Sequence, residues 1–167
     1  MDTIGKEADN RDLGFQSKSE NIEIHTLGQP DEIGEEGTEE TPQKRPIEKI
    51  LFIDDEEAVR SIFKDGLERC GYSVEVASNG QDGLKSFREN PSDLIITDIF
   101  MPEQDGHAFI YEILKEFPDV KIFAITGNKS FDPEMELDIA QTLGAVKTFA
   151  KPVKISRLLA AIKELSL

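Results

Sequence analysis

Residues 94–106, LIITDIFMPEQDG, carry an acidic side chain at the end of a short, largely apolar run. Leu94, Ile95 and Ile96 would point to both faces of a strand, which indicates a strand that helices cover on both sides, as in a parallel sheet. Asp98 ends this run, and a loop with one proline follows it. Open α/β sheets bind ligands at the carboxyl ends of their strands. The stretch therefore predicts a buried strand with Asp98 at the ligand-binding edge.

Apolar runs and helical patterns alternate along the chain on both sides of this stretch. Strands are predicted at residues 50–53, 74–77, 94–96, 122–126 and 146–149. Helices are predicted at residues 56–70, 80–90, 107–117, 133–143 and 155–162. Five strands that alternate with five helices indicate βαβ crossovers and therefore a parallel sheet, doubly wound if the helices divide between its faces. We predict an α/β fold.

Apolar residues within two of these helices predict which helix faces pack on the sheet. The inward positions expected are Val59, Ile62, Phe63 and Leu67 in the first helix, and Met135, Ile139 and Leu143 in the fourth. Cys70 continues the first pattern and, as the only cysteine, cannot form an internal disulfide, so we expect a buried, reduced thiol. Asp132 is expected to cap the fourth helix, with Pro133 in its first turn.

The composition divides the chain at residue 46. Residues 1–46 lack sustained periodicity and are rich in Glu, Asp, Gly, Thr and Pro, so we expect a disordered acidic arm. Residues 47–167 form the predicted folded domain. The formal net charge is −15, of which −7 falls on the arm and −8 on the domain. Nucleic acid is not expected as a direct partner, because phosphate binding depends on Lys and Arg.

Nothing in the sequence predicts a membrane segment. No apolar run approaches the roughly 20 residues that cross a bilayer. The first ten residues are acidic and lack the apolar core of a secretory signal. We therefore expect a cytoplasmic protein.

Polar side chains stand at the ends of four of the five predicted strands. Asp54 and Asp55 follow the first strand, Asp98 the third, Thr126 ends the fourth, and Lys151 follows the fifth. In a parallel sheet these ends lie on one edge, so residues far apart in the chain converge. Three carboxylates at one place need a cation or protons to offset their repulsion. Mg²⁺ fits best, because it takes carboxylates, waters and phosphate oxygens as ligands.

Such a pocket is suited to phosphoryl transfer, which depends on in-line positioning and on neutralisation of charge. Asp98 would be the nucleophile and acceptor, while Thr126 would donate to one phosphoryl oxygen and Lys151 would contact another. Each residue also has a structural alternative. Asp54 and Asp55 could cap a helix, Thr126 could be present because threonine suits a β-strand, and Lys151 could be a surface charge. Their joint occurrence at four strand ends favours a site.

These motifs together resemble the receiver domain of two-component response regulators. The matching residues are Asp54 and Asp55, the run DIFMPEQDG from Asp98, Ile125-Thr126-Gly127, and Lys151-Pro152, and the resemblance covers residues 47–167. It implies a flavodoxin-like fold, a doubly wound five-stranded parallel sheet in the order 2-1-3-4-5 with five helices. It also implies that Asp98 accepts phosphate from a phosphohistidine on a sensor histidine kinase or a histidine phosphotransfer protein.

The resemblance also implies a set of metal ligands. Asp55, Asp98 and the backbone carbonyl of Phe100 would ligate Mg²⁺ (or Mn²⁺) directly. Asp54 would act through a water molecule.

Switching residues and a partner surface are implied in the same way. Phe149 matches the aromatic residue that turns inward when the threonine, here Thr126, moves toward the phosphoryl group. The Lys151-Pro152 peptide would be cis, which would aim the lysine into the pocket. The face formed by the fourth helix, fifth strand and fifth helix would bind a partner or a second copy of the chain.

Other functions fit the residues less well. A haloacid-dehalogenase-type phosphatase uses similar groups but places its nucleophile in a D-x-D motif at the first strand, whereas here that strand is followed by DDEE. A nucleotide-binding module would need a glycine-rich loop at the same place. A degenerate receiver would lack the acceptor or a metal acid. We therefore expect a phosphoacceptor signalling protein and not an enzyme acting on other molecules.

Two expectations concern the output and the histidine near the site. Leu167 follows the last predicted helix directly, so we expect a stand-alone receiver that relays phosphate or binds an unknown downstream protein. The acidic arm is either a tether or itself the regulated element. His107 opens a helix near the site, and we expect it to be solvated.

Overall fold

The computed structural model describes residues 45–102, 106–127 and 132–166. Nearly all of the predicted acidic arm lies outside the described residues. Its disorder, and the domain boundary at residue 46, therefore stay predictions.

The strands form one parallel sheet. They are β1 (Lys49–Ile53), β2 (Ser73–Ala77), β3 (Leu94–Asp98), β4 (Lys121–Thr126) and β5 (Lys147–Ala150). Their order across the sheet is β2-β1-β3-β4-β5, and every neighbouring pair is parallel. The predicted fold class and strand order are confirmed.

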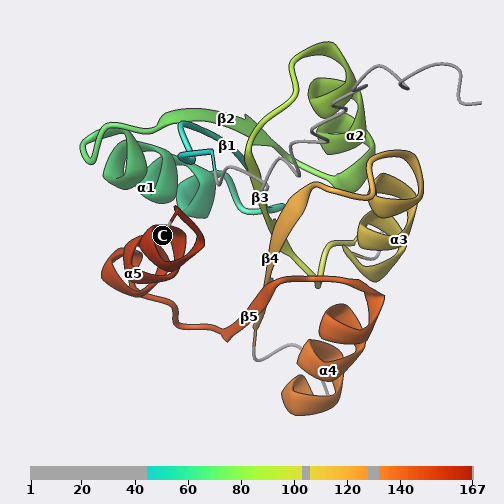
Figure 1. Ribbon diagram of the computed structural model, residues 1–167. Helices are drawn as coiled ribbons and strands as arrows, with labels where there is room; N and C mark the ends of the chain where they lie inside the picture. Colours follow the sequence, from blue (N-terminus) through green and yellow to red (C-terminus); the bar gives the residue numbers. More distant parts are fainter. Residues whose placement is uncertain (1–44, 103–105, 128–131, 167) are drawn as a thin grey trace, which may run out of the picture. The chain divides into compact units, whose positions relative to one another are not determined.

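Five helices cover the two faces of this sheet. They are α1 (Glu57–Glu68), α2 (Gly80–Glu89), α3 (Gly106–Glu116), α4 (Pro133–Leu143) and α5 (Ile155–Ser166). Helices α1 and α5 lie on one side, and α2, α3 and α4 lie on the other (Figure 1). The sheet is therefore doubly wound.

The apolar core has two halves, one on each face of the sheet. Leu94 and Ile96 of β3 pack with the residues of α1 and α5, and Ile95 packs with those of α2 and α3. All five residues of β3 are buried. The continuous apolar run seen in the sequence thus has the expected cause, because both faces of this strand are covered.

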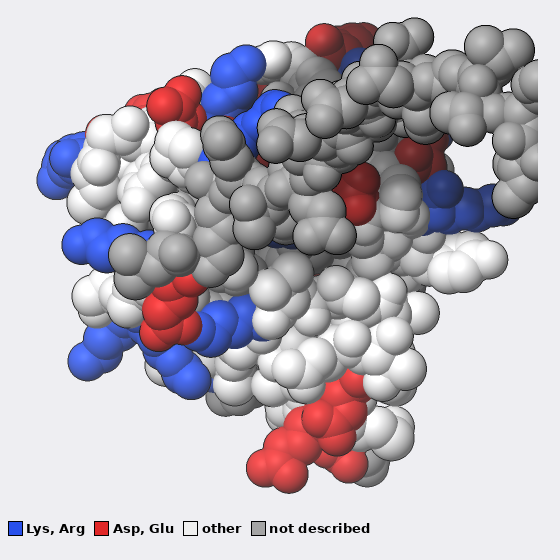
Figure 2. Space-filling model, in the orientation of Figure 1, with Lys and Arg blue, Asp and Glu red and all other residues white. Residues whose placement is uncertain are grey.

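Opposite charges gather over different helices of the face seen in Figure 2. Acidic side chains lie over α4, and basic side chains lie around α5. None of the described helices is long and apolar enough to span a bilayer.

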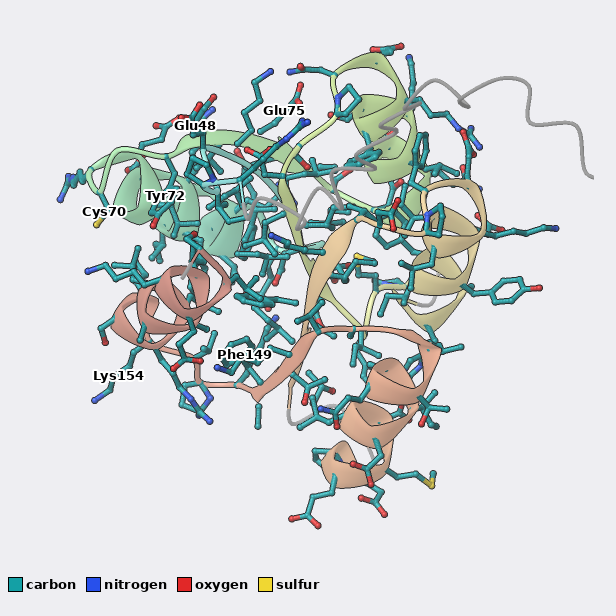
Figure 3. All side chains as sticks on the ribbon, in the orientation of Figure 1. Glu48, Cys70, Tyr72, Glu75, Phe149 and Lys154 are labelled. Carbon is teal, nitrogen blue, oxygen red and sulfur yellow. The ribbon has the colours of Figure 1, made fainter. Side chains whose placement is uncertain are left out.

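Two expectations about α1 are wrong. Cys70 is exposed, because α1 ends at Glu68 and the chain turns through Gly71, which has a φ of +95° (Figure 3). The apolar spacing that included Cys70 therefore runs past the end of the helix. Ile62 is also exposed, at 61%, since the inward face of α1 is formed by Phe63 and Leu67.

The stripe predicted for α4 is also wrong in part. Met135 and Ile139 are exposed, at 54% and 39%. Ala140 is the one buried residue of this helix, and Leu137 and Leu143 pack partly against the same core. A small side chain thus marks the closest approach to the sheet. The predicted cap is present, because the Asp132 carboxylate accepts a hydrogen bond from the backbone N–H of Met135 at 3.1 Å.

Two isoleucine-to-alanine substitutions test the contrast between buried and exposed positions. Ile96→Ala removes a fully buried side chain from the middle of the sheet, so we expect the free energy of unfolding to fall by about 2–5 kcal/mol. Ile62→Ala is expected to change it by no more than about 0.5 kcal/mol. Urea denaturation measures both, and equal losses in the two variants would contradict the core described above.

Candidate functional site

Two neighbouring strands bring three carboxylates to one edge of the sheet. Asp54 and Asp55 follow β1, and Asp98 is the last residue of β3. The register pairs Ile53 with Thr97, so the two strands end at the same level. One carboxylate oxygen from each of the three residues lies within 4.8 Å of the other two. We call Asp54, Asp55 and Asp98 the acidic cluster.

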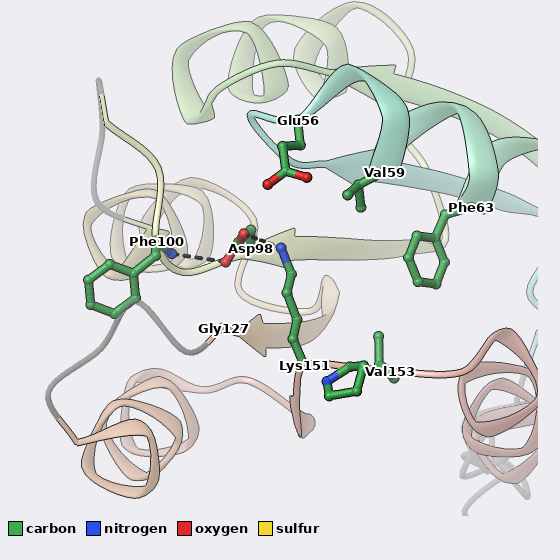
Figure 4. A pocket seen from close by; sticks show the side chains of 9 residues that line it. Glu56, Val59, Phe63, Asp98, Phe100, Gly127, Lys151 and Val153 are labelled. Atoms are coloured by element: carbon green, nitrogen blue, oxygen red, sulfur yellow. Dashed lines mark hydrogen bonds and ion pairs between the residues drawn. The ribbon is translucent and has the colours of Figure 1, made fainter.

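Lys151 places a positive charge against the acidic cluster. Its Nζ donates hydrogen bonds to Oδ2 of Asp54 at 2.8 Å and to Oδ2 of Asp98 at 2.5 Å. Its backbone N–H donates to the carbonyl of Thr126 at 2.6 Å, which fixes the start of the loop after β5. The peptide between Lys151 and Pro152 is cis. Figure 4 shows the lysine side chain extended toward Asp98.

Burial and pairing act in opposite directions on these groups. Burial raises the pKa of Asp98, and the hydrogen bond from Lys151 offsets this only in part. Burial lowers the pKa of Lys151, but its hydrogen bonds to Asp54 and Asp98 outweigh burial and raise that pKa overall. Lys151 is therefore held in its charged form. The negative charge of Asp98 is only partly compensated by Lys151.

The three carboxylates of the acidic cluster differ in how many of their oxygens accept hydrogen bonds. Oδ1 of Asp54 accepts the backbone N–H of Glu56 at 2.9 Å, so both of its oxygens are engaged. Oδ1 of Asp98 accepts the N–H of Phe100 at 3.0 Å. Among the described residues, no hydrogen-bond donor engages the Asp55 carboxylate. Asp55 is thus the most available ligand for a hard cation, because both oxygens of Asp54 and both of Asp98 already accept hydrogen bonds.

Thr126 carries an unpartnered hydroxyl at the end of β4, the strand next to the one that ends in Asp98. It is fully buried at the end of β4, one residue beyond the one that pairs with Asp98. Its Oγ1 has no hydrogen-bond partner among the described residues. An unpartnered buried hydroxyl is costly and calls for an explanation such as a missing ligand. The donor set fits a divalent cation and an anion with acceptor oxygens.

The site opens into a pocket of about 480 Å³ (Figure 4). Its polar wall is formed by Glu56, Asp98 and Lys151. The rest of the lining is mainly apolar and comes from Val59, Phe63, Phe100, Gly127, Pro152 and Val153. A substrate that reaches Asp98 therefore passes an apolar surface on α1 and on the loop after β5.

Phe149 lies inside the core, near the end of β5. It is 2% exposed, and its ring meets that of Phe123 edge to face at a centroid distance of 5.4 Å. The guanidinium carbon of Arg157 lies 5.6 Å from the centre of the Phe149 ring. The structure thus records the inward position of this side chain.

The expectation that His107 is solvated is wrong. Its side chain is 13% exposed and lies between α3 and α4. Nε2 lies 3.0 Å from the backbone carbonyl oxygen of Glu136, and Nδ1 lies 3.4 Å from a carboxylate oxygen of the same residue. His107 therefore fastens α4 to α3.

Two residues near the site, Gly106 and Arg60, were given no role in the sequence analysis. A Cβ atom at Gly106 would lie 2.5 Å from the carbonyl oxygen of Asp98 and 2.6 Å from Cα of Ile99, so α3 can begin this close to β3 only with glycine. Glycine at the start of a helix is a signal that could have revealed this contact. Arg60 donates from Nη1 to the backbone carbonyls of Asp54 and Asp55.

Comparison with known proteins agrees with this geometry. A family model described as the response regulator receiver domain matches residues 50–163. The chain belongs to this family. The match spans all five strands except the first residue of β1, together with the whole acidic cluster and Lys151.

Curated relatives of this receiver domain are regulators about twice its length. The probable transcriptional regulator ycf27 of Cyanidium caldarium is 34% identical over 126 residues, which are 75% of this chain and 49% of the relative. The alkaline phosphatase synthesis transcriptional regulatory protein PhoP of Bacillus subtilis is 34% identical over 116 residues, or 69% of this chain and 47% of that protein. The chain thus spans about half the length of these relatives. The stand-alone arrangement stays a prediction.

A solved structure shares the fold of this receiver domain. The response regulator receiver domain protein from Clostridium thermocellum superposes with a TM-score of 0.66 and 34% identity. The superposition covers 71% of this chain and 94% of that structure.

The raised pKa of Asp98 makes stability depend on pH. A carboxyl whose folded pKa lies above its unfolded value binds protons more readily in the folded state, so its ionisation opposes folding as the pH rises past the unfolded pKa. In metal-free buffer we expect Asp98→Asn to have a higher melting temperature than the wild type at pH 7. The difference in melting temperature between the two proteins should narrow as the pH falls toward the pKa that Asp98 has in the unfolded chain.

Asp65→Asn, an exposed position of α1, is the matched control. Thermal unfolding followed by circular dichroism measures all three proteins. A lower melting temperature of Asp98→Asn than of the wild type at pH 7 would contradict burial as the dominant effect on the pKa of Asp98. A difference in melting temperature that widens on acidification would contradict it as well.

Proposed function

We propose that this receiver domain accepts a phosphoryl group on Asp98 from a phosphohistidine. A carboxylate oxygen of Asp98 attacks phosphorus, a P–O bond forms as the P–N bond breaks, and the imidazole leaves. The product is an acyl phosphate. The observation that carries the proposal is the unpartnered, buried hydroxyl of Thr126 at the end of β4, next to the strand that ends in Asp98, with Lys151 as a second donor.

Each donor has a place in this reaction. The Thr126 hydroxyl would donate to one phosphoryl oxygen, which would satisfy a group that has no partner among the described residues. The Lys151 ammonium would contact another, since it already lies 2.5 Å from Asp98. Charge on the transferring group is thus met by fixed donors that need little reorganisation.

Mg²⁺ would be held by Asp55, Asp98 and the backbone carbonyl of Phe100, with Asp54 acting through water. The hydrogen bonds support the direct role of Asp55, since no described donor holds its carboxylate. When bound, Mg²⁺ (or Mn²⁺) would supply the positive charge that neutralises phosphoryl oxygens. The chain would act only on itself, by accepting the phosphoryl group and later losing it to water.

The donor would be a protein, either a sensor histidine kinase or a histidine phosphotransfer protein. Support comes from the apolar wall of the pocket, to which Val59 and Val153 contribute. Ile62 adds an exposed apolar side chain on the same helix as Val59. A small phosphodonor would need no such surface, whereas a helix that carries the histidine would bury it. A cytoplasmic location is part of this proposal.

Phosphorylation would be read out through Thr126 and Phe149. Movement of the Thr126 hydroxyl toward the phosphoryl group would leave room behind it for the aromatic ring. The ring of Phe149 already lies inward, packed on Phe123, and this position supports the proposal that it can occupy the space.

The decisive experiment is incubation with a small phosphodonor and Mg²⁺, followed by intact-protein mass spectrometry. We expect the wild type and the exposed control Asp65→Asn to gain one phosphoryl group, and Asp98→Asn to gain none, because the amide cannot form the acyl phosphate. Equal labelling of Asp98→Asn would contradict the choice of acceptor. Release of phosphate from unrelated monoesters would favour a phosphatase.

We propose in addition that the face formed by α4, β5 and α5 binds a downstream protein or a second copy of the chain. Met135, Ile139 and Val146 leave apolar surface exposed on α4 and at the start of β5. Acidic residues of α4 and basic residues of α5 flank this surface (Figure 2). A two-fold arrangement could pair the acidic helix of one copy with the basic helix of the other.

Sedimentation velocity of the phosphorylated protein tests the second-copy arrangement. Ile139→Asp places a charge in the apolar surface, so we expect self-association to weaken by at least about tenfold, the equivalent of roughly 1.4 kcal/mol. Ile62→Asp, the same change on exposed α1, should leave self-association unchanged. If the phosphorylated wild type remains a monomer at all concentrations, the face serves a different protein.

A further inference from the structure

Arg60 occupies an unusual place for a basic residue. It is the fourth residue of α1, near the positive end of the helix dipole, where acidic side chains are favoured and basic ones are not. Its Nη1 donates to the backbone carbonyl of Asp54 at 2.7 Å and to that of Asp55 at 3.0 Å. The guanidinium therefore bridges the two residues that carry two of the three acidic-cluster carboxylates.

These carbonyls have no place in the regular hydrogen bonding of the fold. The ladder between β1 and β3 ends with the pair Ile53 and Thr97, so both carbonyls lie beyond it. Helix α1 begins only at Glu57. Among the described residues, no donor other than Arg60 reaches either carbonyl. Without Arg60 neither carbonyl would have a donor among the described residues, and the Asp55–Glu56 peptide group would keep only the hydrogen bond from its N–H to Oδ1 of Asp54.

The orientation of these peptide groups sets the direction of the side chains that they carry. Asp54 is held from within the loop, because its Oδ1 accepts the N–H of Glu56 at 2.9 Å. No described donor holds the Asp55 carboxylate itself. Its direction toward Asp98 therefore depends on the backbone, which Arg60 holds at both carbonyls and Asp54 holds at the N–H of Glu56.

We propose that Arg60 is a positioning residue for the cation site: it orients the backbone of Asp54 and Asp55 so that the Asp55 carboxylate faces Asp98. The inference rests on the proposed function, in which this cluster holds Mg²⁺. Groups that orient metal ligands in this indirect way typically contribute about 10- to 100-fold to metal affinity.

The charge of Arg60 makes the proposal sharply testable. A guanidinium close to a divalent cation repels it, so an effect through charge alone would make Mg²⁺ bind more tightly once Arg60 is removed. A positioning role predicts weaker Mg²⁺ binding once Arg60 is removed, because loss of the two hydrogen bonds frees the loop. The direction of the change in affinity therefore separates the two effects.

Isothermal titration calorimetry with Mg²⁺ is the primary measurement. We expect Arg60→Met, which keeps an unbranched stem but removes charge and donors, to weaken binding about tenfold. Arg60→Lys should restore most of the affinity, because its ammonium can donate to the same two carbonyls. Arg69→Met, an exposed position at the other end of α1, is the matched control and should bind as the wild type does.

A second readout is the Mg²⁺ dependence of labelling by a small phosphodonor. In Arg60→Met the half-saturating Mg²⁺ concentration should rise by the same factor, while the rate at saturating Mg²⁺ stays near that of the wild type. A general structural defect would lower the saturating rate as well. If Arg60→Met does not fold, Arg60→Gln takes its place, with the same weakening expected because a shorter neutral side chain loses the bridge.

The outcomes separate this inference from the function on which it rests. Equal or tighter Mg²⁺ binding in Arg60→Met, with the wild type binding normally, would overturn the positioning role and leave the proposed function standing. A wild type that binds no Mg²⁺ would overturn both.

Discussion

One ammonium group between two buried carboxylates is the interaction on which the rest of the site depends. Lys151 lies within hydrogen-bond distance of both Asp54 and Asp98, and a third acid, Asp55, completes the cluster. Buried charges are tolerated only when they are paired or bound to a cation. The folded chain must therefore bring the ends of β1, β3 and β5 to one place.

The parallel sheet meets this requirement through register and close packing. Asp98 is level with the end of β1 because Ile53 pairs with Thr97. Helix α3 begins almost against the acceptor strand, which the missing side chain of Gly106 permits. The loop that carries two of the acids is tied to α1 by Arg60. Rigid elements thus hold a site whose charges, left alone, would separate.

Most of the fold could be predicted from the sequence, and each incorrect prediction has its own physical cause. Buried strands such as β3 are apolar on both faces, which leaves a clear signal in the sequence. Helix α4 is held by Ala140, while the larger Met135 and Ile139 are exposed, so size and apolarity pointed to the wrong face. Cys70 was misplaced because spacing alone does not show where a helix stops.

The residues at the strand ends can be read from the sequence, because each apolar run stops where a polar group begins. Asp54, Asp98, Thr126 and Lys151 could be named on that ground alone. How these groups meet is visible only in the folded chain: which oxygens Lys151 bridges, that the Thr126 hydroxyl lacks a described partner, and that Arg60 holds the first acidic loop. Those contacts depend on strand register and side-chain packing between segments far apart in the chain, and no local pattern encodes them.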